Sequence, residues 1–171
     1  RRIDKNTGII STLAGTTIGF SGDGGNALYA NLSHTEGIAA DAWGNILVAD
    51  MGNNRIRRIH NTTLNISTAA GTGVAGYSGD GGPATAARMY NPWGMAIDKF
   101  GNLIVVEYSN LVVRKITPSG YISTIAGTNS PGYSGDGGPA SAATLNYCYG
   151  MTVDSAGAVY LSESSSNVIR K

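Results

Sequence analysis

The sequence predicts an all-β protein built from repeated units of short strands. The pentapeptide SGDGG occurs three times, at Ser21–Gly25, Ser78–Gly82 and Ser134–Gly138, so it recurs about every 57 residues. Charged residues make up only 13% of the chain and 25 residues are glycine, which suits turn-rich β structure better than a helical bundle. Other segments keep the same period: ISTLAGT at Ile10–Thr16 returns as ISTAAGT and ISTIAGT. The repeat therefore covers the whole chain.

Each unit predicts four strands in a fixed order. A short apolar strand such as GMAID ends at an aspartate, and a D-x-x-G-N turn follows at Asp41–Asn45 and Asp98–Asn102. Asp closes an Asx-type turn, and Gly accepts the positive φ that such a turn needs. The second strand is NILVAD or NLIVVE, the third is RIRRI or VVRKI, and the fourth is the ISTLAGT segment. Several of these strands are apolar throughout, which indicates burial on both faces.

Four antiparallel strands at this period are typical of the blades of a β-propeller. The repeats cover approximately residues 1–57, 58–114 and 115–171. The segment Arg1–Ile3 matches Arg57–Ile59, and Lys171 matches Lys115, so both ends fall within a blade. Three blades are too few for a ring, because known propellers have about four to eight. We therefore expect a part of a longer array, or a unit that another chain completes.

The SGDGG segments lie in long connections between units. In the fullest copy, Pro83 fits the first turn of a short helix that the Ala-rich segment ATAAR continues. We expect the aspartates to cap local backbone N–H groups, including those at this helix start, while the glycines allow the required dihedral angles. The aromatic rings that precede the loops are expected to pack against the blade edge. The loop-structuring residues, which could also contact a partner, are Ser21, Asp23, Ser78, Asp80, Ser134 and Asp136, and the rings are Phe20, Tyr77 and Tyr133.

A calcium or small-ligand site at these loops stays open as an alternative. Calcium takes six to eight oxygen ligands, so one Asp, one Ser and nearby carbonyls fall short within a single loop. Three loops could combine only if they converged on the propeller axis.

The combined pattern G-x-A-x-D-x-x-G-N-L-x-V-x-(D/E), R-K-I and I-S-T-x-A-G-T resembles the NHL-repeat family of β-propellers. The inserted segment G-Y-S-G-D-G-G-P-A-T-A-A resembles one subclass of that family. The resemblance implies propellers, often of six blades, that are used mostly as interaction modules. Repeats of this subclass resemble those of large secreted or surface proteins, which favours an extracellular or cell-surface location.

The recurring charges predict one structural ion pair in each blade. An acid ends the second strand and an arginine lies on the third, and hairpin pairing brings these strands side by side. A basic face for RNA, as in some NHL propellers, is the alternative, but the formal net charge of +1 does not favour it. The expected pairs are Asp50 with Arg57, Glu107 with Arg114, and Glu163 with Arg170.

Catalytic and metal-binding patterns are sparse. His34 and His60 lie in different parts of their repeats, and zinc needs three or four converging ligands, so we expect no metal site and no cofactor. The single cysteine, Cys148, is expected to be a small packing residue. Three sequons place candidate N-glycosylation at Asn61, Asn31 and Asn65, with Asn61 in a polar turn that would tolerate a glycan.

These features predict a non-enzymatic scaffold for protein–protein interaction or assembly. The expected partners are other protein chains or further repeats of the same chain, which could build a homo-oligomer or a fibre. Nucleic acid is not an expected partner, and no apolar run reaches the roughly 20 residues that a membrane helix needs. A ligand- or metal-binding propeller, including a lyase-like one, is the alternative function, and an RNA-binding NHL propeller is the second alternative.

Overall fold

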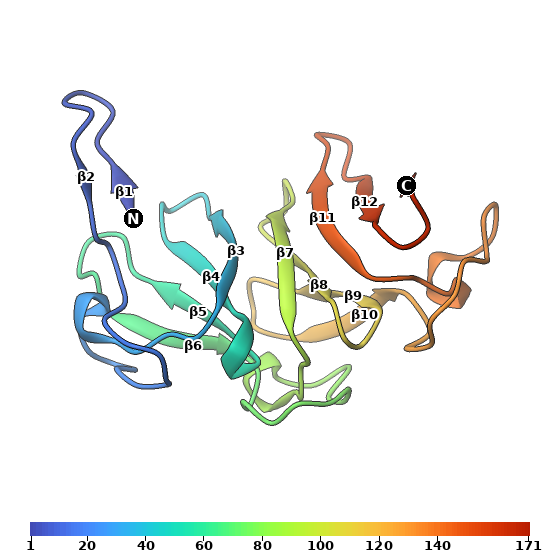
Figure 1. Cartoon of the computed structure of the whole chain (residues 1–171), viewed down its shortest axis with the longest axis horizontal. Helices are drawn as coiled ribbons and strands as arrows, with labels where there is room; N and C mark the ends of the chain where they lie inside the picture. Colours follow the sequence, from blue (N-terminus) through green and yellow to red (C-terminus); the bar gives the residue numbers. More distant parts are fainter.

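A computed structural model describes residues 1–171 as four antiparallel sheets that stand side by side in chain order and form an open arc (Figure 1). The first sheet pairs β1 (Arg2–Ile3) with β2 (Ile10–Ser11), and the second contains β3 (Thr35–Ala40), β4 (Ile46–Asp50), β5 (Arg55–Ile59) and β6 (Ile66–Ala70). The third contains β7 (Pro92–Ile97), β8 (Leu103–Glu107), β9 (Val112–Ile116) and β10 (Ile122–Ala126), and the fourth contains β11 (Cys148–Val153), β12 (Val159–Glu163) and β13 (Val168–Arg170). The predicted all-β propeller architecture is confirmed.

Strands follow chain order across each sheet, and the first strands of neighbouring sheets contact one another. Strand β7 packs against both β3 and β11, so these three strands line the inner side of the arc (Figure 1). The sheets are offset from the sequence repeats, because the expected boundaries after residues 57 and 114 fall inside β5 and β9.

Strand β8 shows why the apolar runs do not alternate with polar residues. All five of its residues are buried. Leu103 and Val105 join the core between the second and third sheets, whereas Ile104 and Val106 join the core between the third and fourth sheets. Successive side chains of a strand point to opposite faces, and both faces of this strand are covered by a neighbouring sheet.

The D-x-x-G-N turns form as the sequence predicts. The Oδ1 atom of Asp41 accepts hydrogen bonds from the backbone N–H groups of Trp43 at 3.0 Å and Asn45 at 2.9 Å, and its Oδ2 accepts one from the Asn45 side chain at 2.8 Å. In the fourth sheet Ala158 replaces the asparagine, and the Tyr160 hydroxyl donates to Asp154 Oδ2 at 3.0 Å instead. The Tyr160 hydroxyl thus takes the place of the missing asparagine amide.

The glycines near the starts of β3 and β7 permit the close approach of neighbouring inner strands. A Cβ atom at Gly94 would lie 2.5 Å from the backbone oxygen of Tyr149 on β11. The strand pairing shifts register beside this glycine, between Pro92 and Met95, so the strand carries a bulge there. Gly37 occupies the same position in β3 and approaches Trp93 of β7 in the same way.

The SGDGG loops cross to the outer edge of the next sheet before the chain turns inward. The Gly81 N–H donates to the Ile122 oxygen at 2.8 Å, and the Ile122 N–H donates to the Gly82 oxygen at 3.1 Å. The loop thereby covers the otherwise unpaired edge of β10 and protects it from pairing with another chain. The equivalent loop in the first repeat covers β6 through Gly24 and Gly25.

The helix expected after Pro83 is a single 3-10 turn, η3 (Ala84–Ala86). Equivalent turns are η1 (Ala27–Tyr29) and η4 (Ala140–Ala142), and a fourth, η2 (Met51–Asn53), follows β4. The turn ends early because Ala87 already adopts an extended conformation at φ −76° and ψ 147°. None of these short turns has the length or the apolar character that a membrane-crossing helix requires.

Candidate functional site

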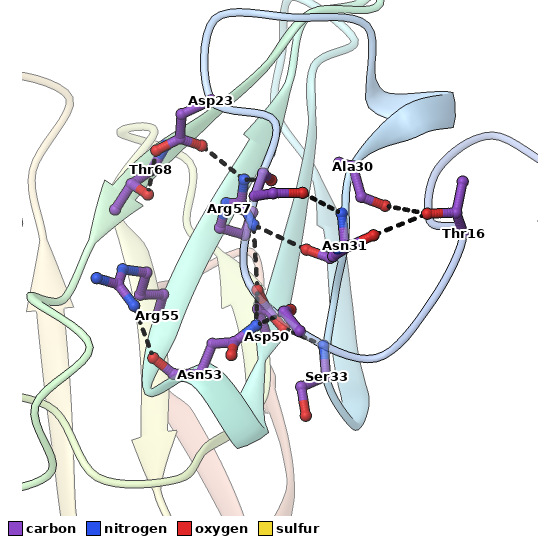
Figure 2. A network of polar contacts seen from close by, with 12 residues as sticks. Thr16, Asp23, Ala30, Asn31, Ser33, Asp50, Asn53, Arg55, Arg57 and Thr68 are labelled. Carbon is purple, nitrogen blue, oxygen red and sulfur yellow. Dashed lines mark hydrogen bonds and ion pairs between the residues drawn. The ribbon is translucent and has the colours of Figure 1, made fainter.

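A buried arginine is held between two acids in the second sheet (Figure 2). Arg57 on β5 has no exposed side-chain surface; its Nη1 lies 3.2 Å from Asp50 Oδ2 and its Nη2 lies 2.6 Å from Asp23 Oδ1. Asp50 ends β4, and its Oδ1 also accepts the Ser33 N–H at 2.7 Å. Asp23 comes from the SGDGG loop, and its Oδ2 accepts the backbone N–H of Thr68 on β6 at 3.2 Å. We name this set of one arginine and two acids the arginine clasp.

The same clasp recurs in the third and fourth sheets. Each arginine contacts the acid that ends the second strand and the aspartate of the preceding SGDGG loop. Arg114 lies 3.0 Å from Glu107 and 2.6 Å from Asp80, and Arg170 lies 3.2 Å from Glu163 and 2.6 Å from Asp136. The clasps differ in exposure: Asp80 is 42% exposed and Asp136 is 64% exposed, and Arg114 is fully buried whereas Arg170 is not.

The structure therefore brings each expected acid and arginine together and adds the loop aspartate to the pair. We expected the loop aspartates to accept backbone N–H groups, including those at the start of the following helix, and the helix-start part of this expectation is wrong; Asp23 and Asp80 accept N–H groups of the sheet that their loop covers. Neither η3 nor η4 receives a side-chain cap, because Pro83 and Pro139 occupy the capping positions. Only η1 is capped, by Asn26, whose side chain accepts the Leu28 N–H at 2.9 Å. The carboxylates instead satisfy arginines on the sheet that each loop covers.

The serines of the loops contribute mainly through their backbone oxygens. Arg57 Nη2 donates to the Ser21 oxygen at 3.0 Å, Arg114 Nη2 to the Ser78 oxygen at 3.2 Å, and Arg170 Nη2 to the Ser134 oxygen at 2.7 Å. Each guanidinium thus closes the loop onto its blade through both a carboxylate and a carbonyl.

The aromatic rings before the loops pack on the arginines, and the expected contact with the blade edge is seen for Tyr77, whose hydroxyl lies 2.8 Å from the Thr124 hydroxyl on the edge strand β10. The guanidinium carbon of Arg57 lies 4.8 Å from the centre of the Phe20 ring, and Arg55 lies 3.8 Å from the same ring. The rings of Tyr77 and Tyr133 each lie 5.2 Å from their clasp arginine. A cation over an aromatic face is attracted by the quadrupole of the ring, which adds to the hold on the guanidinium.

The three loop aspartates do not meet at a shared site, since each is bound to the arginine of its own sheet. No group of three or more His, Cys, Asp or Glu side chains is placed to hold a metal ion. His34 Nδ1 lies 3.1 Å from the Ser33 hydroxyl, and His60 Nδ1 lies 3.1 Å from the Thr62 hydroxyl. Both histidines are therefore engaged in local turn contacts.

Cys148 is buried at the start of β11 and packs in the core between the third and fourth sheets. Burial, followed by the nearby charge of Glu163, raises the pKa of the Cys148 thiol to about 12. The thiol therefore stays protonated near neutral pH, and a protonated thiol is a poor nucleophile.

The three sequon asparagines differ in how their side chains are engaged. The Asn61 side chain is exposed but donates to the backbone oxygen of Trp43. The Asn31 Oδ1 accepts the hydroxyls of Thr16 and Thr17 at 2.8 and 2.9 Å. Asn65 is exposed, and its side-chain amide, unlike those of Asn61 and Asn31, makes no hydrogen bond.

An aromatic cluster lies where the inner strands of the third and fourth sheets begin. The Tyr108 ring centre lies 5.4 Å from that of Trp93, 5.1 Å from that of Tyr147 and 5.0 Å from that of Tyr149. Trp93 and Tyr149 meet edge to face, with centres 5.0 Å apart and planes at 89°. Trp93 and Tyr108 are half-buried, whereas Tyr147 and Tyr149 keep 39% and 38% of their surface exposed.

One hydrogen bond links two rings of this cluster, because the hydroxyls of Tyr149 and Tyr108 lie 3.2 Å apart. The hydrogen bond between the two hydroxyls, followed by partial burial, raises the pKa of Tyr108 to about 12. The phenol is thus held in its protonated, hydrogen-bonding form well above neutral pH.

Sequence reasoning missed the aromatic cluster, although one signal was available. Trp93 and Tyr149 both stand one residue before the aligned glycine of the first strand, where the first repeat has Glu36. Tyr108 similarly aligns with Met51. The cluster therefore belongs to only one of the junctions between sheets, and the repeat itself does not require it.

Comparison with known proteins gives a consistent family signal. A family model described as the teneurin NHL domain matches residues 72–134. Mouse teneurin-4 is 33% identical over 98 residues, which cover 50% of this chain and 4% of that protein. The chloroplastic protein SUPPRESSOR OF QUENCHING 1 of Arabidopsis thaliana is 32% identical over 123 residues, covering 68% of this chain and 12% of that protein. The chain thus spans a small part of the curated relatives that it matches.

Solved structures of similar fold include a protein of unknown function from Bacteroides thetaiotaomicron, at 25% identity and a TM-score of 0.65. The match covers 74% of this chain and 31% of that one. Virginiamycin B lyase from Staphylococcus aureus matches at 16% identity and a TM-score of 0.52, covering 85% of this chain and 43% of the lyase. At such low identity, the likeness to the lyase concerns the fold alone.

Proposed function

We propose that this chain, which belongs to the NHL-repeat family of β-propellers, is a non-enzymatic scaffold that binds other protein chains or further propeller repeats. The observation that carries the proposal is the aromatic cluster of Trp93, Tyr108, Tyr147 and Tyr149. Tryptophan and tyrosine are the residues most enriched at the energetic centres of protein interfaces. Here they form one half-exposed surface that the repeat architecture does not need.

The placement of the charges supports a scaffold over an enzyme. Six of the recurring charged residues, together with the loop aspartates, are paired within the clasps, and the arginines of the second and third sheets are fully buried. Their pairing holds the loops on the blades, which favours a structural role for these groups over proton transfer or substrate binding. Resemblance of the subclass to large secreted or surface proteins supports an extracellular or cell-surface location for this scaffold.

Site-specific photo-crosslinking tests the proposal. A benzoylphenylalanine at Tyr149, in the aromatic cluster, is compared with one at Phe100, which is 70% exposed beyond the opposite end of β7. We expect a discrete protein adduct from position 149 only. An excess of the unlabelled chain should reduce the yield of this adduct, and Trp93→Ala should abolish it. An adduct of twice the chain mass would identify a second copy as the partner. Equal adducts at both positions, or none at position 149, would contradict the proposal.

The ligand- or metal-binding alternative rests on the fold shared with enzymes such as virginiamycin B lyase. It predicts a stoichiometric bound metal in the purified protein, which elemental analysis measures directly. The RNA-binding alternative predicts salt-sensitive association with RNA. Since the chain has a formal net charge of only +1, we expect no saturable binding in a filter assay at 0.15 M salt.

A further inference from the structure

A groove of about 420 Å³ opens between the second and third sheets, on the side of the turns that follow the first strands. Its volume lies within the roughly 300–1,000 Å³ typical of small-molecule sites. One wall carries Trp43, Arg58 and Ser67, and the other carries Thr117 and Ser119 beside the apolar floor of the sheets. None of these five side chains belongs to an arginine clasp or to the aromatic cluster.

Trp43 is an exposed indole on a rigid turn. Its side chain is 67% exposed, although its backbone is held on both sides. The Asp41 carboxylate accepts the Trp43 N–H at 3.0 Å, and the Asn61 side chain donates to the Trp43 oxygen. The aligned residues in the other two repeats are Phe100 and Ala156, so the turn does not need an indole. An exposed indole on a backbone held in this way is suited to stack on the apolar face of a ligand.

Arg58 is an unpaired guanidinium in the same groove. It follows the buried clasp arginine, Arg57, and alternation along β5 turns it to the opposite face of the sheet. It is exposed and makes neither an ion pair nor a hydrogen bond, unlike its neighbours Arg55 and Arg57. A guanidinium offers five N–H donors in a planar fork that matches a carboxylate.

Hydrogen-bond donors exceed free acceptors in this groove. Asp41 is the acid that lines it, but its two oxygens already accept three hydrogen bonds from the turn. Ser67 leaves its hydroxyl free. The Thr117 hydroxyl is already occupied by Ser119 at 2.9 Å and by the backbone of Tyr121, whereas the Ser119 hydroxyl keeps capacity for a further partner. The groove thus suits a flat-faced ligand that carries hydroxyls and a carboxylate.

We propose that this groove binds a hexuronic acid unit of an acidic glycan. The Trp43 indole stacks under the pyranose ring, the Arg58 guanidinium pairs with the sugar carboxylate, and the hydroxyls of Ser67 and Ser119 bond to the ring hydroxyls. This activity is separate from protein binding at the aromatic cluster, because the groove lies near the opposite end of the inner strands.

Calorimetric titration of the whole chain with trigalacturonate and with a glucuronate-containing trisaccharide tests the proposal. We expect saturable binding of at least one of them, with affinity reduced at least tenfold in Arg58→Ala and in Trp43→Ala. The matched controls are Lys115→Ala and Phe100→Ala, which alter the aligned residues of the next repeat and should change the affinity less than twofold. In Trp93→Phe, where Trp43 is the remaining tryptophan, saturation should shift the tryptophan fluorescence.

Three results would overturn the proposal. The first is the absence of saturable heat with either acidic trisaccharide up to about 10 mM. The second is a loss of affinity in the Lys115→Ala control as large as that in Arg58→Ala, which would indicate general charge attraction. The third is equal binding of a neutral trisaccharide that Arg58→Ala leaves unchanged, which would remove the role of the carboxylate.

Discussion

Asp80 and Arg114 lie 34 residues apart in sequence, yet their side chains form an ion pair at 2.6 Å that joins an inter-sheet loop to the third strand of the following sheet. The arginine side chain is fully buried, and the aspartate is 42% exposed. This contact fixes the loop that covers β10, and the Asp23–Arg57 pair does the same for the loop that covers β6, while the Asp136–Arg170 pair holds the last loop against β13.

Replacing Asp80 by Asn should destabilise the fold by about 2 kcal/mol. Removing one partner of a buried pair costs about 3–5 kcal/mol, and the partial exposure of Asp80 reduces that figure. The matched control is Asp136→Asn, since Asp136 is 64% exposed and its arginine is not fully buried. Its free energy of unfolding should fall by less, and urea unfolding of the two variants measures the difference. Equal losses would show that burial of the arginine does not set the strength of the clasp.

Replacing Gly94 by Ala should destabilise the fold by at least about 2 kcal/mol through steric conflict between inner strands. The new Cβ would lie 2.5 Å from the backbone oxygen of Tyr149, so β7 and β11 would have to separate. Gly25→Ala is the control, because its nearest contact would be 3.4 Å away and its φ is not positive. Thermal unfolding that is unchanged in Gly94→Ala would refute the close packing of the inner strands.

Replacing Tyr108 by Phe should alter stability at high pH. Because the folded-state pKa of Tyr108 is raised from 10.0 to about 12, this group stabilises the fold fully below pH 10. That contribution is lost as the pH rises from about 10 to 12, since the unfolded chain releases the proton first. Between denaturation at pH 9 and at pH 11.5, the free energy of unfolding should decline less in Tyr108→Phe than in the unmodified protein. An equal decline in both proteins would mean that Tyr108 titrates normally.

Glycan occupancy should favour Asn65 over Asn31 if the protein passes through a secretory pathway. The Asn65 side-chain amide is exposed and makes no hydrogen bond, whereas the Asn31 side chain accepts two hydroxyls. Expression with secretion, followed by peptide mass spectrometry before and after glycosidase treatment, measures occupancy at each site. Occupancy at Asn31 without occupancy at Asn65 would contradict this ranking.

The period, the strands and the turns could be predicted because they depend on residues close together in sequence. Asp41 and Asn45 lie within one turn, and their roles follow from the chemistry of Asx turns. The contact of Asp50 with Arg57 also follows from one hairpin, since Asp50 lies opposite Arg55 and Arg57 is its diagonal neighbour, within reach of a long side chain. Reasoning from neighbouring residues gave the wrong partner for the loop aspartates. In two of the three repeats a proline occupies the capping position after the loop.

The sequence alone therefore determined the all-β repeat and the content of each blade. Tertiary structure decided which arginine each SGDGG aspartate meets, because the loop crosses to the edge of the next sheet before its carboxylate finds a partner. It also decided that Trp93, Tyr108 and Tyr149 form one surface, and that Trp43 and Arg58 line one groove. The side chains of each set are separated along the chain, and only the packing of neighbouring strands and sheets brings them together.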